Sequence, residues 1–472
     1  MLILITENIM KIISVKPEFN AFCWKTSIRA RVVFGLLALL SLALQPVSIN
    51  AQRNGAATQI SDKNLIFDKD KFIAKINESK LGAGVLDGYA AVIVKNGVVV
   101  AEAAGGPAVR GDEEKGEKYA QMTTSTPNDI GSSFKLVSFI TLLSIFEKRA
   151  AKNPAYTIEK QLNEPIFAYL PKAWRDCVSN NGVSGTACIL LPNSQDRARI
   201  AKITFAQLMS HKSGFRTLPS NANAPFDYIK AGVKAENVGV RSYANMNAAI
   251  LTYLWPRLVD PAKADSLEAY FSTYNPLSPN HAAYGKAYGD FFESWMQTNV
   301  FNVIKPKVHP SCDPAVDFPK RNPPVIFARY YKNPLGGENS LYWSEKDNNH
   351  GCHAQGGYYL SMRQLVAFMA NYQATNLIIS GSVREMMYND STEATRDARI
   401  GWSRTIVSPF ATKYFKVNEI PIHGGDGYGH SAIVQLPGGY IAVGTMNGAG
   451  NSTRVATDLK DAWGEALRAN FE

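Results

Sequence analysis

The pattern of apolar and polar positions predicts strands at both ends of the chain. Near the N-terminus, the runs Tyr89–Lys95 and Val98–Glu102 are separated by Asn96-Gly97, the strongest short-range signal for a hairpin. Strands return toward the C-terminus, most clearly over residues 433–436 and 440–444. Two terminal groups of strands are accommodated most simply in one sheet.

Between the strand groups, apolar residues recur with a helical period. The segment that follows Ser132 is apolar on nearly every face from Phe134 to Phe146, which predicts a buried helix. Residues 259–351 are rich in proline and aromatic residues, so we expect a long ordered loop region there without regular elements. Further helices are predicted over residues 71–81, 158–169, 203–210, 244–258, 362–371 and 455–470.

These elements predict an α+β fold. An antiparallel sheet formed by the N- and C-terminal segments is flanked by helices, and a mainly helical lobe is inserted between its two halves. We expect the sheet lobe to comprise about residues 70–130 and 395–472, and the helical lobe about residues 131–394.

A targeting segment precedes this domain. A basic region ends at Arg31 and an apolar core follows over Val32–Leu44, with Ala51 as the expected last residue before cleavage. The apolar core is shorter than the about 20 residues that a membrane-spanning helix needs. We therefore predict a signal peptide over residues 1–51, a mature domain over residues 52–472 without a stable membrane span, and a periplasmic or secreted location. A retained anchor and a start at a later methionine stay open.

Composition narrows the expected partners. The net charge of +10 is spread along the sequence without a basic block, so nucleic acid is not an expected partner. Segment 350–353 contains histidine and cysteine, which are common metal ligands, but the sequence has no second cluster of such residues at a matching spacing. We therefore predict neither a metal nor another cofactor. The expected partner is a small-molecule or peptide substrate, with peptides derived from peptidoglycan among the candidates.

The cysteines agree with export. Cys23 lies in the targeting segment, which leaves four cysteines in the mature chain. Cys177 and Cys188 flank a loop rich in glycine, serine and asparagine and are expected to pair, as are Cys312 and Cys352. The other pairings stay open because the sequence does not decide between them.

The first chemical signal is Ser132, three residues before Lys135 at the start of the buried helix. A lysine one turn further along a helix can reach back and take the proton of a serine hydroxyl. Burial disfavours the charged form of that lysine, as a general base at neutral pH requires. The helix N-terminus would also stabilise an oxygen anion formed at Ser132.

Two later segments could supply partners for Ser132. Tyr243 beside a lysine cation would have a lowered pKa and could shuttle protons, and Asn245 could hold the lysine or donate to a substrate carbonyl. The segment 423–426 opens the C-terminal strands. Its glycines would let the backbone approach the reacting carbon, and an exposed N–H there could share an oxyanion with that of Ser132.

Together these residues resemble the motifs of the serine β-lactamase/penicillin-binding-protein-like hydrolases. That family includes class C β-lactamases, D-alanyl-D-alanine carboxypeptidases, D-aminopeptidases and β-lactamase-like esterases. Ser132-Ser133-Phe134-Lys135 matches the first motif, Ser-x-x-Lys, and Tyr243-Ala244-Asn245 matches the second, Tyr-x-Asn. His423-Gly424-Gly425 resembles the third, and residues 203–215 and 356–365 resemble two further family segments in the same order.

The resemblance implies a β-lactamase/transpeptidase-like fold and a role for each matched residue. Ser132 would be the acylated nucleophile, Lys135 and Tyr243 would activate it and protonate the leaving group, and His423 would complete the proton network. The N–H groups of Ser132 and Asp426 would form the oxyanion hole. The residues expected to bind substrate are Asn245, Gly424, Gly425 and Asp426.

The third motif departs from the lysine of class C β-lactamases. His423 stands in its place, and a histidine with a pKa near about 6.5 is mostly neutral at pH 7. A neutral residue would anchor a substrate carboxylate poorly, which weakens the β-lactamase interpretation and leaves esters, amides and D-amino-acid peptides as candidate substrates. His211, within the segment 203–215, is expected to be structural.

We therefore predict an exported serine hydrolase that cleaves an amide, ester or lactam bond through an acyl-enzyme on Ser132. The alternative is a penicillin-binding or sensor-type protein that is acylated at Ser132 without efficient turnover. A stable adduct on Ser132 without product release would favour the alternative.

Overall fold

The computed structural model describes most of the chain after residue 65. The described residues are 66–79, 87–111, 118–179, 194–217, 225–270, 281–331, 353–388, 400–406 and 414–468. The signal peptide expected over residues 1–51 lies outside them and stays a prediction. Within the described ranges, no helix is long and apolar enough to cross a membrane.

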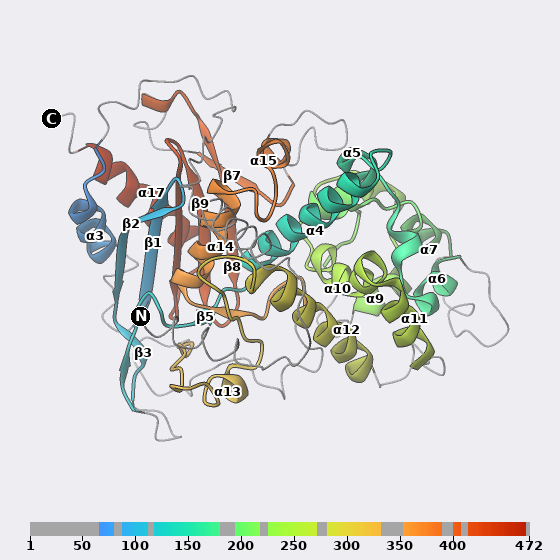
Figure 1. The fold of residues 1–472 in the computed structure, drawn as a ribbon, viewed down its shortest axis with the longest axis horizontal. Coiled ribbons are helices and arrows are strands. Elements are labelled where there is room, and N and C mark those ends of the chain that lie inside the picture. Colours follow the sequence, from blue (N-terminus) through green and yellow to red (C-terminus); the bar gives the residue numbers. More distant parts are fainter. Residues whose placement is uncertain are drawn as a thin grey trace, which may run out of the picture. The chain divides into compact units, whose positions relative to one another are not determined.

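Both ends of the chain contribute to one six-stranded antiparallel sheet (Figure 1). Tyr89 of the first strand lies opposite Met446 of the last, so the two ends pair directly. The predicted hairpin turn is confirmed, because Asn96 and Gly97 have φ of 51° and 82°, as a turn of this type requires. The strand order is β2 (Val98–Gly105), β1 (Tyr89–Lys95), β10 (Tyr440–Met446), β9 (His430–Leu436), β8 (Glu419–Asp426) and β7 (Ser403–Ile406).

Helices cover both faces of the sheet (Figure 1). Alternate residues of β1 enter different cores: Ile93 packs with α3 (Lys69–Glu78) and α17 (Ser452–Arg468), whereas Val92 belongs to the core that includes α4 (Ser133–Lys152) and α14 (Met362–Ala374). This alternation is the period of a strand that is buried on both sides. The predicted fold class is confirmed.

The helical lobe is built around α4 and α10 (Met246–Val259), which contact each other and are buried over most of their lengths. Shorter elements surround them. These are α5 (Ile158–Leu162), a 3-10 turn (Ile166–Tyr169), α6 (Lys172–Ser179), α7 (Ser194–Ile200), α8 (Phe205–Met209), α9 (Pro225–Ala231), a second 3-10 turn (Ala235–Asn237) and α15 (Gly381–Tyr388).

The expectation of a region without regular elements over residues 259–351 was wrong for its first half. The structure contains α11 (Pro261–Tyr270), α12 (His281–Met296) and a π-helical turn (Gln297–Phe301), with the short α13 (Pro314–Asp317) further on. The reason is a helical stripe of buried side chains that the proline count concealed. Its members are Tyr284, Tyr288, Phe292 and Met296.

Two other predicted elements differ from the structure. The helix expected over residues 158–169 is broken by Pro165, where the chain bridges to Thr204 before the 3-10 turn begins. The segment 423–426, expected to open the C-terminal strands, is the last half of β8, which begins earlier, at Glu419. Four very short strands complete the description: β3 (Pro107–Val109) with β4 (Ala120–Gln121), and β5 (Asn128–Asp129) with β6 (Tyr359–Leu360).

Candidate active site

The N-terminus of α4 presents Ser132 next to the sheet. Gly131, with φ of 48°, turns the chain into the helix, and Ser132 directly precedes the first helical residue. The helix is buried without interruption from Ser133 to Phe146. Because its first turn also contacts β8, its direction is fixed, and with it the position of the Ser132 hydroxyl.

The structure brings Ser132, Lys135 and Tyr243 together, as the motifs predict. Lys135 Nζ donates to Ser132 Oγ at 2.7 Å, and the Tyr243 hydroxyl lies 2.7 Å from the same oxygen. Lys135 Nζ also donates to the carbonyl of Gln355 at 2.8 Å. The lysine is thus held between the serine and a backbone carbonyl that the sequence had not indicated.

Burial changes the acid–base behaviour of Lys135. Its side chain is 1% exposed, and loss of hydration lowers its pKa to about 7, although the negative charge of Asp129 acts in the opposite direction. The amine is therefore close to half neutral at pH 7. This confirms the expectation that the apolar helix would favour a neutral lysine.

The expectation of a lowered pKa for Tyr243 was wrong. The ring is 52% exposed, yet the hydroxyl lies in the site, where loss of hydration raises its pKa despite the hydrogen bond with Ser132. The negative charge of Asp426 acts in the same direction as burial. Tyr243 therefore enters the site as a neutral phenol, a donor as well as an acceptor.

His211 lies closer to the site than expected. Its ring is 4.7 Å from that of Tyr243, with an angle of 31° between the planes. Nδ1 accepts from the N–H of Ala244 at 3.4 Å and lies 3.0 Å from the Asn247 amide, so the histidine ties the chain beside Tyr243 to α10. Burial lowers its pKa to about 3, so the ring is neutral.

Asn245 lies at the start of α10, directly before its first residue. Its amide oxygen accepts from the Tyr243 hydroxyl at 3.3 Å. The side chain is exposed. The amide therefore contacts the tyrosine, not the lysine that it was also expected to hold.

His423 lies on β8 and is buried. Loss of hydration lowers its pKa to about 3, and the nearby charge of Lys135 acts in the same direction, which confirms the expected neutral ring. Its Nδ1 lies 3.1 Å from the carbonyl of Gly424. Among the hydrogen bonds of the described residues, none joins His423 to Ser132, Lys135 or Tyr243, so the expected proton network does not extend to it directly.

The glycines of β8 allow close contact with the chain around Ser132. A Cβ atom on Gly425 would lie 2.0 Å from the Ile130 carbonyl and 2.8 Å from the backbone nitrogen of Ser132. A Cβ atom on Gly131 would likewise lie 2.8 Å from the backbone nitrogen of Asp426. The two N–H groups expected to form an oxyanion hole therefore come from segments in backbone contact.

A small pocket opens beside Tyr243. Arg241 and Ser403 lie at this pocket, with the guanidinium 3.3 Å from the Ser403 hydroxyl, and neither was singled out from the sequence. The position of Arg241, two residues before Tyr243, was the available signal. The pocket is lined by Met209, Ser210, His211, Arg241, Tyr243, Gly401, Trp402, Ser403, His423 and Gly424.

Some of the residues in the metal and disulfide predictions lie outside the described residues. Over the ranges that the structure covers, no group of three or more histidine, cysteine and acidic side chains could hold a metal ion. Cys177 and Cys312 are both buried. Their expected partners, Cys188 and Cys352, lie outside the described residues, so the pairing stays a prediction.

Comparison with solved structures shows a shared fold at low identity. FmtA from Staphylococcus aureus aligns with a TM-score of 0.53 at 16% identity, over 85% of this chain and 92% of that one. A class C beta lactamase from Rhodobacter sphaeroides gives 0.52 at 15% identity, over 83% and 98%. A Beta-Lactamase/D-Alanine Carboxypeptidase from Pseudomonas syringae gives 0.51 at 14% identity, over 85% and 99%.

Comparison at the sequence level gives the family. No curated protein matches this chain. The family model described as Beta-lactamase matches residues 71–463, which include all three motifs and both terminal strand groups. The chain therefore belongs to the beta-lactamase family.

Proposed function

We propose that the chain is an exported serine hydrolase that opens an amide, ester or lactam bond through an acyl-enzyme on Ser132. The observation that carries the proposal is the position of Ser132 Oγ, 2.7 Å from both Lys135 Nζ and the Tyr243 hydroxyl. A serine becomes a nucleophile when a neighbouring base can take its proton. Lys135, with a pKa of about 7, supplies that base near neutral pH.

Acylation follows from these contacts. As Ser132 Oγ bonds to the substrate carbonyl carbon, its proton passes to neutral Lys135 and the carbonyl electron pair moves onto oxygen. The N–H groups of Ser132 and Asp426 receive that oxyanion. When the intermediate collapses, the bond to the leaving group breaks, and the leaving atom takes a proton from Lys135 by way of the Tyr243 hydroxyl.

Deacylation uses the same groups in reverse. A water molecule attacks the ester carbonyl and gives its proton to Lys135 through Tyr243. Ser132 regains a proton as the acid product leaves. Because Tyr243 contacts both Ser132 and Asn245, the amide orients the phenol that relays these protons.

The pocket supports a small-molecule or peptide substrate, with peptides from peptidoglycan among the candidates. His423 is neutral, so the third motif supplies no positive charge to a substrate. Arg241 provides a charged side chain on the other wall of the pocket. No step of the proposed reaction needs a cofactor.

A second candidate is favoured by the acid–base state of Tyr243. Its raised pKa keeps it a neutral phenol at pH 7, so little phenolate is present to take a proton from water. Slow deacylation would leave a long-lived adduct on Ser132, as in a penicillin-binding or sensor-type protein. The signal peptide expected over residues 1–51 and the expected disulfides support a periplasmic or secreted location for either function.

Intact-protein mass spectrometry tests the proposal on the mature chain, residues 52–472, exposed to a fluorophosphonate and, separately, to penicillin. The fluorophosphonate adduct should form on the wild type and disappear in Ser132→Ala. Ser133→Ala is the matched control: this neighbouring serine is fully buried and hydrogen-bonds to Ser431.

Three outcomes separate the candidates. Adducts on wild type and Ser133→Ala, absent from Ser132→Ala, support the assignment of the nucleophile. A penicilloyl adduct that persists for hours points to the sensor-type or carboxypeptidase-type candidate. Equal labelling of wild type and Ser132→Ala, or no labelling at all, would overturn the proposal.

A further inference from the structure

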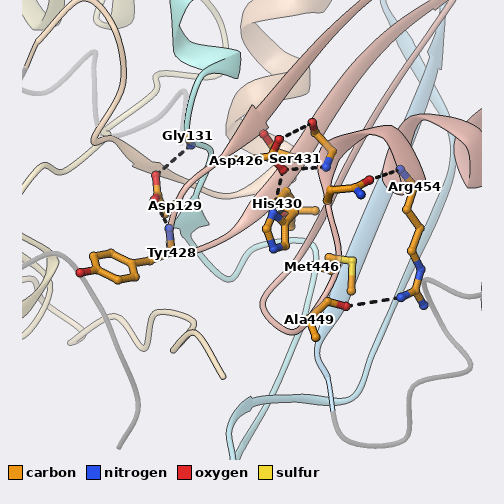
Figure 2. Close-up of polar contacts among 12 residues, drawn as sticks. Asp129, Gly131, Asp426, Tyr428, His430, Ser431, Met446, Ala449 and Arg454 are labelled. Carbon is orange, nitrogen blue, oxygen red and sulfur yellow. Dashed lines mark hydrogen bonds and ion pairs between the residues drawn. The ribbon is translucent and has the colours of Figure 1, made fainter. Parts of the chain in front are cut away.

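Asp129 lies three residues before Ser132 and is fully buried. Figure 2 shows its carboxylate between two backbone segments. Oδ1 accepts from the N–H of Gly131 at 2.8 Å, and Oδ2 accepts from the N–H of Tyr428 at 2.7 Å. The two carboxylate oxygens therefore bind two different parts of the chain.

Both parts lead directly to the expected oxyanion hole. Gly131 is bonded to Ser132, and Tyr428 follows Asp426 by two residues at the turn between β8 and β9. The turn is seated closely, because a Cβ atom on Gly427 would lie 2.3 Å from Asp129 Oδ2. The carboxylate thus links the Ser132 segment to the Asp426 segment.

The Asp426 segment is held from a second side as well. The Asp426 carboxylate accepts from the N–H and the hydroxyl of Ser452, at 2.7 and 2.8 Å, and lies 2.8 Å from His430 Nδ1 (Figure 2). These bonds hold the end of β8 to the start of α17. Asp129 therefore acts on a strand end whose far side is already fixed.

The chemistry at this position requires a carboxylate. Two backbone donors approach two separate oxygens, and an asparagine offers one oxygen only. Its NH₂ group would face the other N–H, so one hydrogen bond would be replaced by a contact between donors. The change would release one segment while leaving the size of the side chain almost unaltered.

We propose that Asp129 is a positioning residue that fixes the separation of the Ser132 and Asp426 N–H groups, and so sets the geometry of the oxyanion hole. The inference rests on the proposed function, because it presumes that Ser132 is the nucleophile. An oxyanion hole works only when its donors are placed before the charge develops.

A second effect separates this role from a purely structural one. The negative charge of Asp129 raises the pKa of Lys135 against the larger effect of burial. The titratable groups around Lys135 also include Tyr243, His211 and His423, of which the histidines are neutral. Removal of the Asp129 charge should therefore move the acid limb of the pH–rate profile to lower pH.

The test compares wild type with Asp129→Asn in their reaction with a fluorophosphonate. We expect the maximal rate of adduct formation to fall about tenfold or more, because oxyanion-hole donors contribute at least that much, while the half-saturating concentration changes less than about threefold. The acid limb should shift downward in the same variant. A maximal rate and an acid limb of the pH–rate profile that both equal those of the wild type would overturn the inference.

Two further variants keep the test decisive. Asp87→Asn is the matched control: this carboxylate is also buried, but it pairs with Arg110 at 3.2 Å, and its loss should lower stability without changing the maximal rate. If Asp129→Asn does not fold, Gly427→Ala takes its place, because the added methyl group would displace the turn from Asp129 Oδ2. This variant should show the same fall in the maximal rate. A wild-type rate in Gly427→Ala would overturn the inference. Equal labelling of wild type and Ser132→Ala would instead contradict the proposed function itself.

Discussion

The two walls of the site differ in burial, and the difference assigns them different tasks. The wall formed by α4 and β8 is closed to solvent: Lys135 is 1% exposed and His423 is 7% exposed. The wall formed by residues 241–245 is open, with Tyr243 52% exposed. The closed wall sets the proton affinity of the base, because hydration is what burial removes. In the proposed reaction the open wall faces the substrate and supplies the hydroxyl of Tyr243 that relays protons to and from the base.

The largest effect is expected from Lys135→Met, which keeps an unbranched side chain of similar length in the closed wall. Loss of the general base should lower the rate of adduct formation at Ser132 about 10³-fold. Fluorophosphonate labelling of the purified variant measures this. Lys148→Met is the matched control, since Lys148 is an exposed lysine on the same helix.

The same variant should change how stability depends on pH. The folded-state pKa of Lys135 is about 7, below the about 10.4 of an unfolded chain. The unfolded wild type therefore binds an extra proton between these values, and wild-type stability should rise with pH across that window. Lys135→Met should lack this rise in urea unfolding measured at pH 7 and pH 10. Parallel stability curves for the two proteins would show that the wall does not depress the lysine pKa.

A smaller effect is expected from Tyr243→Phe in the open wall. Loss of the relaying hydroxyl should slow turnover about 10²-fold. Stability should change little, because the ring is half-exposed and its hydroxyl forms hydrogen bonds only with Ser132 and Asn245 among the described residues. Turnover and thermal unfolding of the variant test both parts, with exposed Tyr119→Phe as the control. A large loss of stability would mean that this wall is structural.

The closed wall was the more predictable of the two. The apolar run from Phe134 to Phe146 indicated a buried helix, and a buried helix implied a neutral lysine at Lys135. Both follow from local sequence, because every residue concerned lies within a few turns of one helix. The hairpins β1–β2 and β9–β10 were predictable for a similar reason, because tight turns join strands that are neighbours in sequence. The pairing of β1 with β10 joins the two ends of the chain and was expected only because one sheet is the simplest arrangement for both strand groups.

The open wall depended on contacts that no local pattern encodes. The raised pKa of Tyr243, the ring of His211 beside it and the Gln355 carbonyl on Lys135 all arise where distant segments meet. The helices within residues 259–351 were missed because the prolines and aromatic residues of this segment obscured the helical spacing of its buried side chains. Asp129 was missed because its partner Tyr428 lies 299 residues away in the chain.

The most direct test of the account is the pH dependence of adduct formation at Ser132, followed by intact-protein mass spectrometry with a fluorophosphonate, whose own reactivity does not titrate in the range used. We predict a rate that rises with pH and levels off, with an apparent pKa of about 7 for Lys135, and loss of that dependence in Lys135→Met. A rate that is flat from pH 5 to 9, or that rises only toward the ordinary pKa of a lysine, would contradict it.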